Sequence, residues 1–129
     1  MKERFEGNTG QRLLIDALTM QKMIAGNESL AEELARFVEI QEIRAGETVI
    51  HQGDADNTIF FILTGSFHIV VNGTVLAKRG PTDHVGEMAA IEPSQARTAT
   101  VIATEDSLIC KLTEPQLAEI GQHLSLIHI

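Results

Sequence analysis

The sequence predicts a mainly β protein: a jelly-roll-like β-roll of about eight short strands, flanked along the chain by helices. Between residues 38 and 112 the apolar residues alternate or form short runs, the pattern of half-buried and buried strands. Clusters of Gly, Pro, Asn and Asp separate these runs, as they do in all-β rolls and sandwiches. Helix-type spacing occurs before residue 38 and after residue 112. The 129 residues are enough for one domain with a substantial core.

The first segment, residues 1–37, is expected to be an N-terminal helical extension. Apolar residues recur at three- and four-residue steps from Gly10 to Ala25, which predicts a helix. The buried face of that helix is expected to hold Leu13, Ala17, Met20 and Ile24. Gly26 ends this helix, and Asn27 can cap a second, acidic helix. The inner side of the second helix is expected to hold Leu30, Leu34 and Phe37.

The second segment, residues 38–112, is expected to form the roll. Its predicted strands are Val38–Ile43, Thr48–Ile50, Thr58–Leu63, Ser66–Val71, Thr74–Ala77, Thr98–Thr104 and Ser107–Leu112. The pair Asn72-Gly73 lies between two of them and is the strongest hairpin signal in the chain, because a type I′ turn needs positive φ at both central residues.

Two further helices are expected, one inside the roll and one after it. The run from Gly86 to Ile91 contains good helix formers and predicts a single short helix between strands, with free backbone amides at its start. Residues 113–129 are expected to form a C-terminal helix, because Thr113-Glu114-Pro115-Gln116 has the pattern of a capping box. This helix is expected to lead into an output domain that the sequence lacks.

Charge and composition argue against several classes of partner. The formal net charge is −8 and there is no basic block, so the chain is a poor candidate for nucleic-acid binding. Its one cysteine, Cys110, lies in an apolar stretch and is expected to be a buried core thiol. No apolar run reaches the roughly 18 residues that span a bilayer. We therefore expect a cytoplasmic protein that does not contact the membrane, and one whose N-terminal helices could support a homo-oligomer.

The segment from Gly86 to Val101 has the chemistry of an anion site. A helix start offers free N–H groups, and Gly86 lets backbone approach a ligand closely. Arg97 could place a guanidinium fork on two phosphate oxygens, with the Thr98 hydroxyl beside it. Glu87 suits a hydroxyl donor such as a ribose 2′-OH, so the segment matches a cyclic sugar phosphate. The plain alternative is a surface ion pair between Glu87 and Arg97.

These motifs resemble two hallmarks of the cyclic-nucleotide-binding domain family. Gly86-Glu87-Met88-Ala89 and Arg97-Thr98-Ala99 are similar to the two halves of its phosphate-binding cassette. The stretch from Gly53 to Gly65 is similar to its other hallmark, a Gly-acidic turn leading to an aromatic-aliphatic strand. The resemblance covers about Glu39 to Ile120 and implies a β-roll with flanking helices.

The resemblance also implies roles for single residues. Glu87 would accept from the ribose 2′-OH, Arg97 would pair with the cyclic phosphate, and Thr98 would assist Arg97. Backbone amides around Met88 and Ala89 would complete the phosphate cradle. The residues implied around the base are Ile69, Leu76, Arg79 and Val85. The ligand would be a 3′,5′-cyclic nucleotide, with no metal, no other cofactor and no catalytic residue.

Within the family, the run from His84 to Ser94 and the helical extension resemble the receptor half of bacterial effectors with a C-terminal TIR domain. That resemblance implies cyclic UMP as the ligand and an anti-phage role in which the TIR domain degrades NAD. Cyclic AMP, sensed by a metabolic or transcriptional regulator, is the competing expectation. Val85 stands where the family often has Phe, and the sequence ends before the long helix that usually contacts the base.

Two rival classes use the same fold. A cupin-type enzyme would need clustered metal ligands, but the five histidines are scattered and include no His-x-His. A degenerate family member without a ligand would serve as an interaction module, and the presence of both Glu87 and Arg97 argues against it.

Overall fold

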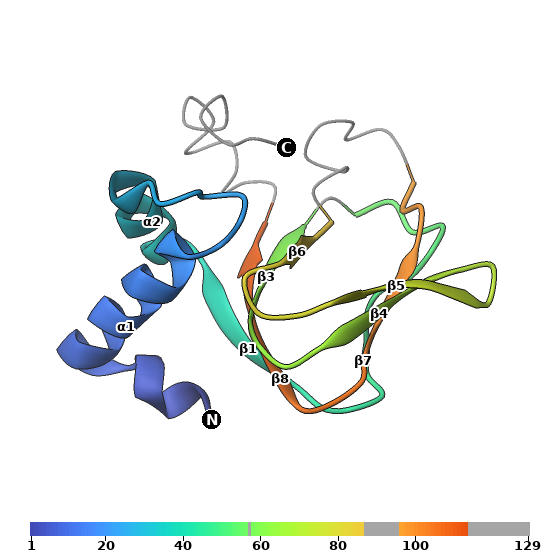
Figure 1. Cartoon of the computed structure of the whole chain (residues 1–129), viewed down its shortest axis with the longest axis horizontal. Coiled ribbons are helices and arrows are strands. Elements are labelled where there is room, and N and C mark those ends of the chain that lie inside the picture. The colour runs from blue at the N-terminus through green and yellow to red at the C-terminus, as the bar shows by residue number, and fades with distance from the viewer. Residues whose placement is uncertain (57, 87–95, 114–129) are drawn as a thin grey trace.

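The computed structural model describes residues 1–56, 58–86 and 96–113 (Figure 1). Three short helices come first in the chain: η1 (Lys2–Phe5), α1 (Gly7–Thr19) and α2 (Glu28–Ala35). Eight strands follow: β1 (Glu39–Ile43), β2 (Thr48–Ile50), β3 (Ile59–Thr64), β4 (Phe67–Val71), β5 (Thr74–Arg79), β6 (His84–Val85), β7 (Thr100–Ala103) and β8 (Ser107–Leu112). The expected helices at 86–91 and 113–129 fall almost wholly outside the described residues.

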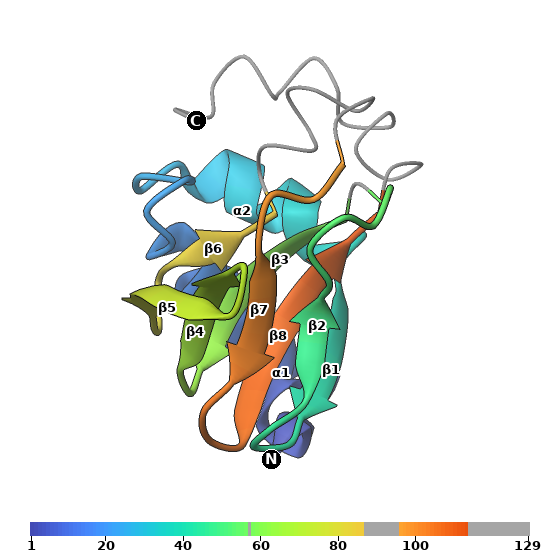
Figure 2. The same cartoon turned by 90° about the vertical axis from the view of Figure 1, so that its right-hand side faces the viewer.

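The strands form two four-stranded sheets, which confirms the predicted mainly β roll (Figure 2). The first sheet has the order β1-β8-β3-β6 and the second the order β2-β7-β4-β5. Every pair of neighbours is antiparallel. The predicted hairpin joins β4 to β5, with φ of 51° at Asn72 and 80° at Gly73, as a type I′ turn requires.

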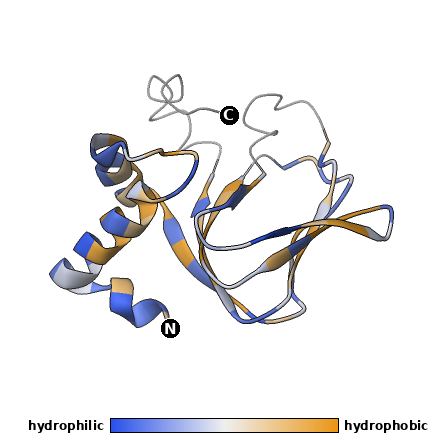
Figure 3. Cartoon of the chain, in the orientation of Figure 1, coloured by the Kyte–Doolittle hydropathy of each residue, from blue (hydrophilic) through white to orange (hydrophobic). Residues whose placement is uncertain are grey.

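The first sheet is buried on both faces, which explains the continuous apolar run of β3. Its alternate residues Ile59, Phe61 and Leu63 pack with the helices, together with Leu108, Cys110 and Leu112 of β8. The intervening residues Phe60, Ile62 and Ile109 face the second sheet and pack with Ile50, Phe67, Val101 and Ala103. The helices lie together on one side of the roll, and Figure 3 shows the apolar colour gathered where elements meet.

The predicted inner face of the first helix is wrong for two of its four residues, while Ala17 packs against the core as expected. Leu13 and Met20 are 44% and 69% exposed, whereas Gly10, Leu14 and Leu18 are buried. The helix also ends at Thr19, earlier than predicted, and Ile24 is buried from the following turn. The apolar residues of this helix are spaced so that either of two faces could be the buried one. Close contact with η1 decides between them, because a Cβ on Gly10 would lie only 2.2 Å from the backbone carbonyl carbon of Phe5.

The second helix agrees with the sequence. The Asn27 side chain accepts a hydrogen bond from the Leu30 N–H at 3.0 Å, so Asn27 is its N-cap. Leu30 and Leu34 are buried in the core between the helices and the first sheet, and Phe37 packs against that core just beyond the helix.

Candidate ligand-binding site

The site is built where three connections of the roll meet: the loop from β2 to β3, the end of β6 and the start of the chain returning to β7. β6 pairs with β3 through Phe60–Val85 and Phe61–His84 and delivers Gly86 to the edge of the roll. The loop and the returning chain are joined by backbone hydrogen bonds, from the Arg97 N–H to the Asp54 carbonyl (2.7 Å) and from the Gly53 N–H to the Arg97 carbonyl (2.8 Å). Residues far apart in sequence are therefore held side by side.

Gly86 has a conformation that only glycine adopts without strain, with φ of 89°. Space is also short around it. A Cβ at this position would lie 2.5 Å from the Thr58 carbonyl oxygen and 2.8 Å from Nη1 of Arg97. The glycine therefore lets the backbone pass directly over the arginine.

Arg97 is a buried cation in the free protein, with only 4% of its side chain exposed. Its Nη1 donates to the Gly86 carbonyl oxygen at 3.1 Å and its Nη2 to the Thr58 carbonyl oxygen at 2.6 Å. Nη2 also donates to Oδ1 of Asp56, which forms an ion pair with the guanidinium. A surface ion pair, the plain alternative for Arg97, does not fit this burial.

Asp56 is the functional candidate that the sequence reasoning missed. Its carboxylate also accepts from the Thr58 N–H at 3.3 Å, and its side chain is 49% exposed. Partial burial raises the pKa of Asp56, but the hydrogen bonds from Arg97 and Thr58 and the charges of Arg97 and Lys111 outweigh it and hold that pKa below its usual value. The acidic turn of the Gly53–Gly65 motif was the signal that could have pointed to this residue.

The other predicted site residues are placed as follows. Gly86 and Arg97 are in direct contact, Thr98 is exposed beside Arg97, and Val85 is buried in the core of the roll. Glu87, Met88 and Ala89 lie outside the described residues.

The residues expected around the base lie mostly on the β4–β5 hairpin. Ile69 packs against the core of the roll, and Arg79 is half-buried at the far end of β5. Ile69 pairs with Ala77, whereas Val70 pairs with Val75, so Leu76 is the extra residue of a β-bulge. Leu76 is 64% exposed, and Figure 3 shows the apolar colour running along this hairpin.

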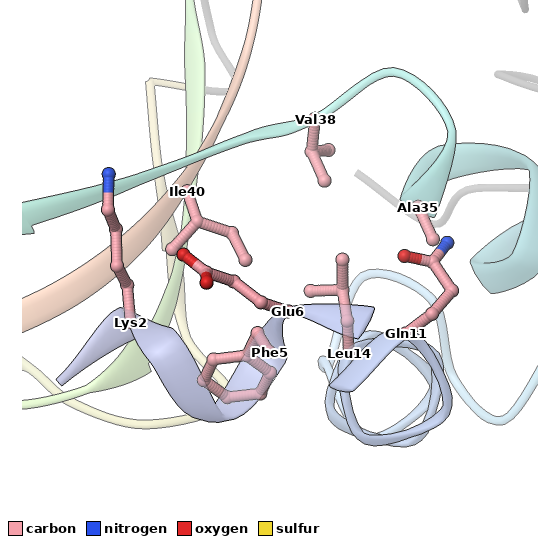
Figure 4. Close-up of a pocket in the computed structure, with 8 residues that line it drawn as sticks. All are labelled: Lys2, Phe5, Glu6, Gln11, Leu14, Ala35, Val38 and Ile40. Carbon is pink, nitrogen blue, oxygen red and sulfur yellow. The ribbon is translucent and has the colours of Figure 1, made fainter. Parts of the chain in front are cut away.

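A separate cavity of about 260 Å³ lies between the helical extension and β1. Figure 4 shows its lining residues: Lys2, Phe5, Glu6, Gln11, Leu14, Ala35, Val38 and Ile40. None of these is a predicted site residue. Its apolar lining residues belong to the core under the helices, so we interpret it as a packing gap of the extension.

Metal-type clusters and membrane-spanning helices are both absent from the described part of the chain. No group of three His, Cys, Asp or Glu side chains in residues 1–56, 58–86 and 96–113 is placed to hold a metal ion. None of the helices in that part of the chain combines the length and apolar character needed to cross a bilayer.

This fold and this buried arginine under a glycine define the class of the protein. The family model for the cyclic nucleotide-binding domain matches residues 40–123, and the chain belongs to that family.

Within the family, the chain is similar to effectors named for the Pycsar system. It is 52% identical to the Pycsar effector protein BcPycTIR of Burkholderia cepacia over 94% of this chain, and 47% identical to XpPycTIR of Xanthomonas perforans over 95%. The Pseudomonas aeruginosa relative, PaPycTIR, is 40% identical over 92% of the chain. The chain spans about 40% of the length of each of the first two.

Solved structures support the fold. The regulatory subunit of a cAMP-independent protein kinase A from Trypanosoma brucei superimposes with a TM-score of 0.78 at 24% identity, over 90% of this chain and 45% of that one. The structure of cAMP-bound PfPKA-R superimposes with a TM-score of 0.80 at 18% identity, over 90% of this chain and 42% of that one.

Proposed function

We propose that this domain binds a 3′,5′-cyclic nucleotide monophosphate and carries out no covalent chemistry itself. The observation that carries the proposal is Arg97, a buried cation held directly beneath the Gly86 carbonyl in a domain of the cyclic-nucleotide-binding family. The planar fork of a guanidinium matches two phosphate oxygens.

The remaining contacts of the ligand form part of the same proposal. Thr98, exposed next to Arg97, would add a hydroxyl to the phosphate, and amides around Met88 and Ala89 would complete its cradle. Glu87 would accept from the ribose 2′-OH. The base would lie against Ile69 and Leu76, near Val85 and Arg79. The β-bulge supports this placement, because bulges beside binding sites redirect side chains.

We further propose cyclic UMP as the ligand and a C-terminal TIR domain as the output, acting on NAD in anti-phage defence. Support comes from the similarity to the Pycsar effectors, whose length this chain covers to about 40%, leaving room in those proteins for a further domain. Ligand binding would shift the population of site conformations and so pass a signal to the output domain. Cyclic AMP is the second candidate, since both ligands have the same cyclic sugar phosphate and differ only in the base.

A calorimetric titration with cyclic UMP, CMP, AMP and GMP tests the proposal. Selective binding of cyclic UMP supports the full proposal, and selective binding of cyclic AMP supports a metabolic or transcriptional sensor instead. Binding of none of the four contradicts the proposal and favours a ligand-free interaction module.

A further inference from the structure

Gln52 joins two parts of the molecule on which the proposed site depends. Its side-chain Nε2 donates to Oδ1 of Asn72 at 3.0 Å, and its Oε1 accepts from the Asn72 backbone N–H at 2.9 Å. Gln52 lies in the loop between β2 and β3, and Asn72 lies at the tip of the β4–β5 hairpin. An amide group both donates and accepts, so this one side chain closes a two-bond ring between the loop and the hairpin.

The hairpin tip needs a contact of this kind. β7 runs beside β4 only as far as the pair Val70–Thr100. Beyond that pair, in the part of the chain that the structure describes, the hairpin is a two-stranded ribbon, because β5 is the edge strand of its sheet (Figure 2). A two-stranded ribbon alone is marginally stable in water and needs outside contacts to keep one position. Gln52 provides them beside the start of β7, where its backbone N–H donates to Oγ1 of Thr100 at 2.9 Å.

The residues directly after Gln52 hold Arg97. The Gly53 N–H donates to the Arg97 carbonyl oxygen at 2.8 Å, and the Arg97 N–H donates to the Asp54 carbonyl oxygen at 2.7 Å. Both are backbone hydrogen bonds, and neither uses the Gln52 side chain. One short segment therefore contacts the residue proposed to bind the phosphate and, through Gln52, the β4–β5 hairpin.

The hairpin carries the residues that are proposed to face the base. Ile69 lies three residues before Asn72, and Leu76 lies four residues after it. Leu76 is the extra residue of the β-bulge and is 64% exposed, so core packing does not hold it in place. Its distance from Arg97 depends on how the hairpin is held. That distance matters for selectivity, because the four 3′,5′-cyclic ribonucleotides share one sugar phosphate and differ only in the base.

We propose that Gln52 is a positioning residue that fixes the β4–β5 hairpin against the loop holding Arg97, and so determines how strictly the domain selects the base of its ligand. The inference rests on the proposed function and deepens it. A hairpin held at one distance favours a base of one size, whereas a hairpin that moves outward also accepts a larger base. Gln52 acts through the hairpin and does not itself contact the ligand.

The test is the ratio of the affinities for cyclic UMP and cyclic AMP, measured by calorimetric titration of the wild type and of Gln52→Ala, with competition titration for the weaker ligand. Alanine removes both side-chain hydrogen bonds to Asn72 but keeps the backbone N–H that donates to Thr100. Because the two lost hydrogen bonds are exposed, we expect the ratio to fall by about three- to tenfold. A loss of stability, or a disturbance of Arg97, lowers both affinities by the same factor and leaves the ratio unchanged.

Two variants of Asn72 test the same contact from the hairpin side. Asn72→Gly keeps the turn and the backbone N–H but removes Oδ1, so the ratio should fall less than in Gln52→Ala. The double variant should match Gln52→Ala, because both changes break one contact. Asn72→Asp keeps both hydrogen bonds and the turn, so its ratio should equal that of the wild type. Gln11→Ala makes the same change on the exposed side of α1 and is the control, with no change in the ratio expected.

Each outcome decides the proposal. An unchanged or larger ratio in Gln52→Ala, or an equal fall in Gln11→Ala, overturns the inference and leaves the proposed function standing. Equal affinities of the wild type for both nucleotides also overturn it, because the hairpin then sets no selectivity. If the wild type binds no cyclic nucleotide, the proposed function itself fails. Gln52→Met keeps the length of the side chain without its amide group, and it replaces Gln52→Ala if melting curves show that the latter does not fold.

Discussion

Arg97 is the central residue of the proposed ligand site. It is 4% exposed, and it holds together the loop before β3, the end of β6 and the return to β7. The same contacts that bury the charge also fix the orientation of the guanidinium before a ligand arrives. Such preorganisation lowers the cost of ordering at the moment of binding.

Replacing Arg97 by lysine tests whether the fork matters beyond the charge. An ammonium cannot make two parallel hydrogen bonds to phosphate, so Arg97→Lys is expected to weaken cyclic nucleotide binding by about 30-fold or more. The measurement is the same calorimetric titration, and Arg44→Lys, an exposed arginine on the β1–β2 turn, is the control. Binding by Arg97→Lys at wild-type affinity would mean that the phosphate does not use this fork.

Cys110 illustrates a residue whose chemistry is suppressed by its position. The thiol lies in the core under the helices, and burial raises its pKa to about 12. Because the thiolate is the reactive form, we expect no labelling of the folded protein by a maleimide at pH 7, and complete labelling in urea. Rapid labelling without denaturant would place the thiol outside the core.

At the scale of elements, the end of β6 is a tightly constrained connection of the roll. Gly86→Ala would place a methyl group on a positive φ and within 3 Å of two atoms of the site. We expect a loss of about 2–4 kcal/mol in the free energy of unfolding, which urea titration measures.

Gly46→Ala is the matched control for this substitution. Gly46 also has a positive φ, of 91°, but a Cβ there meets nothing within 4 Å. This variant measures the loss in the free energy of unfolding that comes from the positive φ alone, which we expect to be about 1 kcal/mol. Equal losses in the two variants would contradict the close approach of Gly86 to Arg97 and Thr58.

The turn after α1 ties the helical extension to the roll. The buried Gln21 donates from Nε2 to the Ile62 carbonyl oxygen at 2.8 Å, and the Lys22 N–H donates to the Thr82 carbonyl oxygen at 3.0 Å. Gln21→Ala is expected to lower the free energy of unfolding by about 1–2 kcal/mol. The control Gln11→Ala, on the exposed side of α1, should change the free energy of unfolding little. Equal losses in the two variants would refute a stabilising role for the hydrogen bond from Gln21 to Ile62.

Local sequence signals predicted most elements because each is decided within a few residues. The type I′ turn follows from Asn72-Gly73, and the Asn27 cap from one side chain and one N–H. β6, of two residues, was missed because so short a strand has no periodicity and exists only through its pairing with β3. The inner face of α1 was missed because its selection depends on contact with η1.

Part of the site was predictable from the sequence because it also depends on local signals. Gly86 and Arg97 were found from their spacing and residue types, and the structure brings them into contact. The partner of Arg97 was not found, because Asp56 is 41 residues away in sequence and reaches it only once the loop and the return to β7 are paired. The roles of Glu87, Met88 and Ala89 stay predictions.

For the molecule as a whole, the first sheet separates two cores: one shared with the helices and one inside the roll. Ligand bound only to the folded state stabilises both together. At a free concentration of 100 times the dissociation constant, a cyclic nucleotide is expected to raise the melting temperature by about 10 °C. Differential scanning fluorimetry with and without ligand measures this shift, and an unchanged melting temperature at saturation would contradict a site inside the roll.

The most direct measurement is a crystal structure of this domain with the tightest-binding of the four cyclic nucleotides. The predicted result is a pair of phosphate oxygens on the Arg97 guanidinium at about 2.7–2.9 Å. A nucleotide bound elsewhere, making no contact with Arg97, would contradict the proposed site.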